Sequence, residues 1–107
     1  MQRGEVWWVN FAPSVGGEIQ KERPAVIVSN NIANRLLNRV QVVPLTSKID
    51  RLYPSEAYVM VNQVQHKAMA DQLTTVSKQR LKNQMGKLDR ADIQAIERVI
   101  RIQLDLT

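Results

Sequence analysis

The chain has 107 residues, with 15 Lys and Arg against 10 Asp and Glu, a net charge of +5 and no cysteine. The length predicts a single domain over residues 1–107, and the lack of cysteine with only one histidine excludes disulfides, thiolate chemistry and a multi-histidine metal site. No segment approaches the roughly 18 apolar residues of a membrane span, so we expect a cytoplasmic protein without membrane association. The positive charge favours a polyanionic partner such as nucleic acid, although charge also serves solubility.

Two β-rich segments open the chain. Apolar residues over 6–11 predict a first strand, and the β-branched run over 26–28 predicts a second. Pro24 suits only a strand start or an edge, which places Arg23 at the mouth of the polar, glycine-bearing loop between the two segments.

Shorter elements follow, and a helix comes last. In chain order we expect a short helix over 31–38, a strand over 39–46 with an irregular end at Pro44, a surface connection over 47–55, a strand over 57–61, one or two strands over 67–76, a helical turn over 77–82 and a short strand over 84–88. Asp89 caps the final helix with Asp92 three residues on, and one face carries Ile93, Ile96, Ile100 and Leu104. The pattern predicts an α+β fold, mainly β, with a strongly bent antiparallel sheet and the helix across its open side.

Five blocks of the sequence, in this order and with these gaps, resemble the MazF/PemK-like toxins. The blocks are GEVWWVNFAP over 4–13, VGGE over 15–18, RPAVIVSN over 23–30, VVPLTS over 42–47 and AMADQ over 68–72. The resemblance implies a Src-homology-3-like small barrel of the CcdB/MazF type, paired into a homodimer with RNA in a groove across the interface. It also implies the toxin of a type II toxin–antitoxin system: an endoribonuclease that needs no metal or cofactor and inhibits translation and growth.

The implied reaction cuts single-stranded mRNA at a short sequence and leaves a 2′,3′-cyclic phosphate and a 5′-hydroxyl. The implied partner is a small acidic antitoxin, which would compete for the basic groove and cover the loop over 14–22. Such a site needs cations on the phosphoryl oxygens and groups that move the 2′ and 5′ protons.

Arg23 and Thr46 are the predicted catalytic residues. The planar guanidinium of Arg23 matches two phosphate oxygens, but an arginine stays protonated and is therefore a poor general base. Taken alone, Arg23 would pair with a carboxylate and Thr46 would only favour a strand, and the resemblance reverses both interpretations. Thr46 falls on the family's catalytic threonine and would position and polarise the substrate, since no adjacent histidine activates it as a nucleophile.

Substrate binding is predicted for a second set of residues. These are Gly17, Glu18, Lys21, Ser47, Asp71 and Gln72. Asp71 could contact base edges, tune protonation or pair with Arg23. Some family members have a histidine where this chain has Glu22, or an acid near Gln65, so the proton acceptor stays open.

Other residues have weaker functional signals. Histidine alone has an ordinary pKa near neutrality, but His66 matches no family histidine, so we expect a surface or interface role. Trp7 and Trp8 point to opposite faces of a strand, and we expect one to serve the core and the other an interface. Lys21, Lys48, Arg51 and Lys67 are candidate contacts to the RNA backbone.

Two other functions remain open. One is a non-catalytic toxin of the CcdB type, which shares the fold and poisons DNA gyrase. The other is an RNA-binding module without activity. Arg23-Pro24 together with Thr46 favours the nuclease, because gyrase poisoning does not need these residues.

Overall fold

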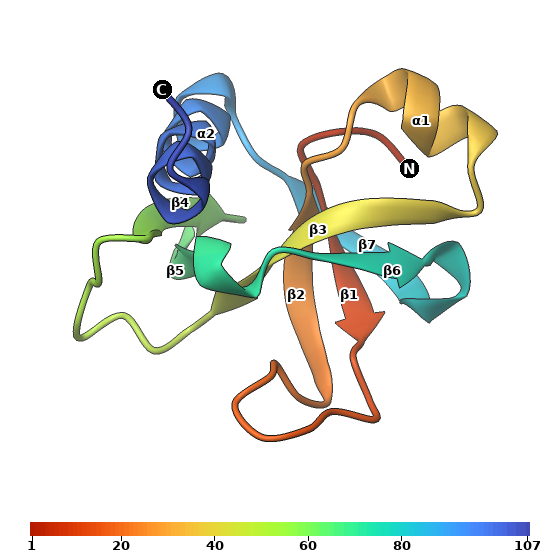
Figure 1. The fold of residues 1–107 in the computed structure, drawn as a ribbon, viewed down its shortest axis with the longest axis horizontal. Coiled ribbons are helices and arrows are strands. Elements are labelled where there is room, and N and C mark those ends of the chain that lie inside the picture. The colour runs from red at the N-terminus through yellow and green to blue at the C-terminus, as the bar shows by residue number, and fades with distance from the viewer.

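Seven strands form one strongly curled antiparallel sheet in the computed structural model, which describes residues 1–107 (Figure 1). The elements, in chain order, are β1 (Glu5–Asn10), β2 (Glu22–Ile27), α1 (Asn31–Leu36), β3 (Arg39–Thr46), β4 (Glu56–Val61), β5 (Val64–Met69), the 3₁₀ turn η1 (Ala70–Gln72), β6 (Thr74–Ser77), the 3₁₀ turn η2 (Lys78–Arg80), β7 (Leu81–Lys87) and α2 (Arg90–Leu104). The order across the sheet is β4-β5-β3-β2-β1-β7, and β6 pairs with β3. The mainly β half-barrel with a C-terminal helix confirms the predicted fold class.

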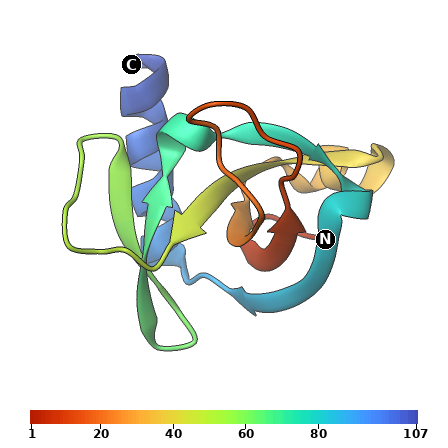
Figure 2. The same ribbon diagram turned by 90° about the horizontal axis from the view of Figure 1, so that it is seen from below.

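The long strand β3 joins the two halves of the sheet. Its residues Val42 to Pro44 pair with β2 along one edge. Along the other edge, its first half pairs with β6 and its last two residues, Leu45 and Thr46, pair with β5. β5 and β6 follow one another along the same edge of β3, where the sheet curls, and β3 ends beside β5 (Figure 2).

Two apolar clusters lie on the two faces of the curled sheet. Successive residues of a strand alternate between faces, so Val26 and Val43 belong to one cluster while Ala25 and Val42 belong to the other. The first cluster packs against α2 through Ile96, which is buried. Burial on both faces explains why β1 to β3 have little polar alternation in their sequence.

The C-terminal helix α2 begins as predicted. The side chain of Asp89 accepts a hydrogen bond from the backbone N–H of Asp92 at 2.9 Å. Ile93 and Ile100 pack beside Ile96 against the first cluster, but Leu104 is half-exposed, because the last turn of α2 extends beyond the sheet. No helix of the structure is both long and apolar enough to cross a membrane.

Two local predictions need correction, and the predicted short helix is present. β2 begins at Glu22, so Pro24 lies inside the strand and not at its start. The β2–β3 hydrogen-bonded ladder ends at Ala25, one residue after Pro24, so the N–H group that proline lacks is not needed for pairing with β3. β7 begins at Leu81 and is longer than predicted. The short helix forms as α1, but Ile32 and Leu36 are exposed to solvent and not packed on the sheet.

Candidate active site

A cavity of about 250 Å³ lies where the first residues of β2 meet the last residues of β3. We call it the Arg23 cavity. Its lining comprises Trp8, Gln20, Lys21, Glu22, Arg23, Pro24, Leu45, Thr46, Ser47, His66 and Met85. Both predicted catalytic residues, together with Lys21 and Ser47 of the predicted binding set, are therefore in one place.

Strand register brings Arg23 and Thr46 together. The β2–β3 ladder ends at the pair Ala25 and Pro44, and two further residues on each strand set Arg23 opposite Thr46. Alternate residues of a strand share a face, so both side chains belong to the same face of the sheet as the pair Ala25 and Pro44. Residues 23 positions apart in sequence thus meet through backbone pairing.

The guanidinium of Arg23 is half-buried and forms no ion pair in the structure. Its Nε donates one hydrogen bond to the carbonyl oxygen of Gln20 at 3.3 Å. That bond orients the plane of the guanidinium, and no protein acceptor is bound to its terminal nitrogens. An arginine held in this way can present its terminal N–H groups to a phosphate.

The hydroxyl of Thr46 lies at the start of the connection between β3 and β4. Thr46 is buried, and its Oγ1 accepts a hydrogen bond from the backbone N–H of Lys48 at 3.2 Å. The hydroxyl proton is not used in that bond, so it can be donated to a phosphoryl oxygen or to a 2′-oxygen.

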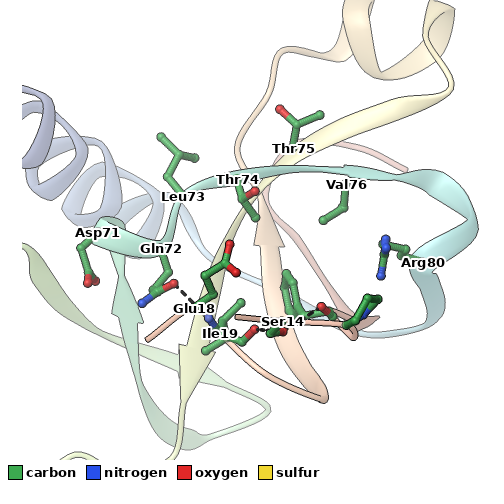
Figure 3. A pocket seen from close by; sticks show the side chains of 12 residues that line it. Ser14, Glu18, Ile19, Asp71, Gln72, Leu73, Thr74, Thr75, Val76 and Arg80 are labelled. Atoms are coloured by element: carbon green, nitrogen blue, oxygen red, sulfur yellow. Dashed lines mark hydrogen bonds between the residues drawn. The ribbon is translucent and has the colours of Figure 1, made fainter. Parts of the chain in front are cut away.

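A second cavity, of about 390 Å³, lies beneath the β1–β2 connection (Figure 3). We call it the Asp71 cavity. Its lining comprises Phe11, Pro13, Ser14, Glu18, Ile19, Asp71, Gln72, Leu73, Thr74, Thr75, Val76 and Arg80. Glu18, Asp71 and Gln72, all predicted to bind substrate, line this cavity. Asp71 lies in a different cavity from Arg23 and does not pair with it.

Gln72 fixes the loop that covers the Asp71 cavity. Its Oε1 accepts the backbone N–H of Ile19 at 3.1 Å (Figure 3). Its Nε2 donates to the carbonyl oxygen of Gly17 at 3.2 Å. From the other side, Arg80 donates to the carbonyl oxygens of Asn10 and Ala12 at 3.0 and 2.5 Å. The amide of Gln72 therefore already has two partners in the loop. Gly17 lies outside both linings and contributes its carbonyl group.

His66 is buried, so the expected surface role is wrong, and the alternative interface role stays a prediction. It is 6% exposed, and its Nδ1 lies 3.0 Å from the carbonyl oxygen of Val64, so Nδ1 carries the proton and donates. His66 pairs with Val59 and shares its face of the sheet, so it approaches the Arg23 cavity from the face opposite Thr46. The sequence did not indicate this burial, because His66 is followed by a lysine, which is normally exposed.

The two tryptophans have different surroundings. Trp7 packs against the second cluster and donates its indole N–H to Glu5 at 2.9 Å, whereas Trp8 lines the Arg23 cavity. Neither ring is fully buried. Four lysine and arginine side chains were predicted to contact the RNA backbone, and for Lys67 this prediction is wrong. Lys67 lies within β5, where it is buried in an ion pair with Glu56.

No group of three or more His, Cys, Asp and Glu side chains gathers in a way that could hold a metal ion.

The family model for the PemK-like, MazF-like toxins of type II toxin–antitoxin systems matches residues 2–104. The chain belongs to this family. It is 35% identical to endoribonuclease MazF9 of Mycobacterium tuberculosis, over 99% of the chain and 98% of that protein. It is 25% identical to endoribonuclease EndoA of Bacillus subtilis, over 99% and 96% of the two chains.

Solved structures of related toxins have the same fold. A mycobacterial endoribonuclease in complex with its cognate antitoxin superposes with a TM-score of 0.83 at 26% identity, covering 100% of this chain and 97% of that one. MazF from Deinococcus radiodurans superposes with a TM-score of 0.87 at 23% identity, covering 98% and 96%. The half-barrel is therefore shared along the whole chain.

Proposed function

We propose that this chain is a toxin that cleaves single-stranded RNA in the Arg23 cavity, without a metal ion. The carrying observation is that Arg23 and Thr46 line one cavity in a chain of the PemK-like, MazF-like toxin family. Relatives along the whole chain are named endoribonucleases, which supports the same activity here.

The reaction uses the RNA's own nucleophile. The 2′-oxygen loses its proton and bonds to the adjacent phosphorus, while the bond from phosphorus to the 5′-oxygen breaks and that oxygen gains a proton. Arg23 holds the phosphoryl oxygens as their charge grows, and the Thr46 hydroxyl donates to a phosphoryl or 2′-oxygen. The products are a 2′,3′-cyclic phosphate and a 5′-hydroxyl.

The surroundings suit an anionic strand. Lys21 and Ser47 line the Arg23 cavity, and Lys48 follows in the exposed connection. Glu18, Asp71 and Gln72 form the Asp71 cavity, where base edges would be recognised. The net charge of +5 favours approach of RNA over the whole molecule.

Two protein partners belong to the same proposal. Structural relatives bound to an antitoxin support an acidic antitoxin that competes with RNA for the basic surface in the cytoplasm. A second copy of this chain would cover apolar side chains that the monomer exposes, as on α1, where Ile32 is 65% and Leu36 71% exposed. Sedimentation of the purified chain tests the dimer, which predicts a mass near twice that of the monomer.

The experiment incubates purified protein with mixed single-stranded RNA in EDTA. We expect cleavage at a short sequence, with cyclic phosphate and 5′-hydroxyl ends. A substrate with a 2′-deoxy nucleotide at the cleaved position should bind and stay intact. Cleavage of the deoxy substrate, or cleavage that EDTA abolishes, contradicts the mechanism, and binding without cleavage indicates an inactive RNA-binding module.

A further inference from the structure

Lys67 is a buried cation on the strand next to the predicted catalytic threonine. Its ammonium lies 2.8 Å from Oε1 of Glu56, and the two side chains are 8% and 9% exposed. It also donates to the carbonyl oxygen of Arg51 at 2.6 Å and lies 5.4 Å from the centre of the Tyr53 ring. A buried lysine needs such partners, because an unpaired charge is costly away from water.

The two charged side chains hold the end of the β3–β4 connection, residues 47–55. Oε1 of Glu56, which faces Lys67, also accepts the backbone N–H of Tyr53 at 2.9 Å. Lys67 thus binds a carbonyl group of the connection and Glu56 binds one of its N–H groups. Most of the connection is exposed and has no regular structure of its own (Figure 2). We call Lys67 and Glu56 the clamp.

A third contact holds the middle of the connection. Tyr58 pairs with Lys67 across the β4–β5 ladder, and its hydroxyl donates to the carbonyl oxygen of Ile49 at 2.8 Å. The connection is therefore held at Ile49, Arg51 and Tyr53 by side chains from β4 and β5.

The clamp also lies beside the Arg23 cavity. In the β3–β5 ladder Thr46 pairs directly with Lys67, and the continued β2–β3 register places Arg23 on the other side of Thr46. Arg23, Thr46 and Lys67 thus form a row across three strands on one face of the sheet. The connection that the clamp holds begins at the residue after Thr46, and its N–H at Lys48 binds the Thr46 hydroxyl.

Stability alone does not require charges here, because apolar residues of similar volume often stabilise a fold as well as a buried ion pair does. An apolar pair could not bind a backbone carbonyl and an N–H of the connection. We propose that Lys67 and Glu56 are positioning residues: they fix the path of the connection and so hold Thr46, Ser47 and Lys48 in place for the RNA phosphate beside Arg23. This inference rests on the proposed function.

The test removes the clamp without leaving a buried charge unpaired. The double variant Lys67→Met/Glu56→Gln keeps side-chain volume and the acceptor for Tyr53 but loses the ammonium. We expect kcat for RNA cleavage to fall about tenfold to 10²-fold, the usual cost of slightly misplaced groups, while the melting temperature changes by only a few degrees. The Kd for a non-cleavable 2′-deoxy RNA should change less than about threefold, because the misplaced groups slow the reaction and do not weaken RNA binding. Lys82→Met, an exposed lysine on β7, is the matched control and should cleave like the wild type.

A second variant decides the matter if the double variant does not fold. Tyr58→Phe removes only the bond to Ile49, so we expect a smaller fall in kcat, about threefold to tenfold, with a folded protein. A folded double variant with wild-type kcat overturns the inference, as does wild-type kcat in Tyr58→Phe when the double variant is unfolded. If the wild type itself does not cleave RNA, the proposed function fails and the inference fails with it.

Discussion

The Arg23 cavity and the Asp71 cavity are built in different ways. In the first, the strand ends of β2 and β3 fix Arg23 and Thr46, and the guanidinium binds a single backbone carbonyl. In the second, the long β1–β2 connection forms one wall, and the side-chain amide of Gln72 forms two hydrogen bonds to it. Groups that do chemistry need positions fixed by regular structure, whereas loops can adapt to a sequence of bases. We therefore propose that the chemistry takes place in the Arg23 cavity and that the RNA sequence is selected in the Asp71 cavity.

The largest expected effect is at Arg23. Arg23→Ala should lower the cleavage rate by about 10²–10³ or more, because one preorganised donor to the developing charge is lost. Arg23→Lys should recover little, since an ammonium lacks the planar fork. Rates are measured on RNA in EDTA, with circular dichroism as the control for folding. Wild-type rates in Arg23→Ala would remove the chemistry from this cavity.

Thr46→Val tests the other half of the same cavity. Valine is nearly isosteric and keeps the preference for a strand, so a fall in rate does not come from unfolding. We expect about a 10²-fold loss of cleavage with RNA binding retained, measured by fluorescence anisotropy. If Thr46→Val cleaves normally while Thr46→Ala only lowers the melting temperature, Thr46 is structural.

Gln72→Ala tests the Asp71 cavity. The change removes both hydrogen bonds to the loop, and we expect KM for RNA to rise about fivefold while kcat changes less. Limited proteolysis should cut the loosened loop faster. Gln65→Ala, an exposed glutamine on β5, is the matched control. A fall in kcat as large as that of Arg23→Ala would place chemistry in both cavities.

His66→Gln should have a smaller effect still. His66 reaches the Arg23 cavity from the opposite face of the sheet, and its Nδ1 is engaged with Val64. We expect a cleavage rate within about threefold of the wild-type rate. A loss of about 10²-fold or more would assign the proton transfer to His66.

Glu5→Gln lies outside both cavities and should leave cleavage unchanged. Burial raises the pKa of Glu5, but hydrogen bonds from Trp7 and Gln2 and the charges of the N-terminus and Lys87 outweigh it, so the pKa lies below its usual value. A lowered carboxyl pKa stabilises the fold above the unfolded-state pKa, and that stabilisation is lost as the pH falls through the folded-state pKa. The variant should therefore melt earlier at neutral pH and lose less stability on acidification. An identical pH dependence of melting in both proteins would contradict this account.

The sequence predicted the features that depend on local pattern. The strand over 39–46 and the cap at Asp89 follow from residues close together in the chain, and the structure has both. The contact between Gln72 and Ile19 spans 53 residues, so nothing in the local pattern indicates that Gln72 would bind the loop. The sequence predicted Arg23, Thr46, Asp71 and Gln72 as site residues but not how they are grouped; in the structure, Arg23 and Thr46 line one cavity and Asp71 and Gln72 line the other.

Burial of charge was the other failure of sequence reasoning. Lysine side chains normally reach solvent, and Lys67 was expected in a connection near the groove, so it looked like an RNA contact. Only the pairing of β5 with β3 and β4 shows that it lies beneath the β3–β4 connection with Glu56 as its partner. The same pairing buries His66, its neighbour in sequence.

The division of labour between the two cavities is tested most directly by single-turnover cleavage at saturating RNA, with Arg23→Ala and Asp71→Ala measured side by side. At saturation, weaker binding no longer lowers the rate, so only a loss of transition-state stabilisation remains. The account predicts a fall of about 10²-fold or more in Arg23→Ala and a rate within about threefold of wild type in Asp71→Ala, with a changed preference among RNA sequences. A fall in Asp71→Ala that equals or exceeds the fall in Arg23→Ala would contradict it.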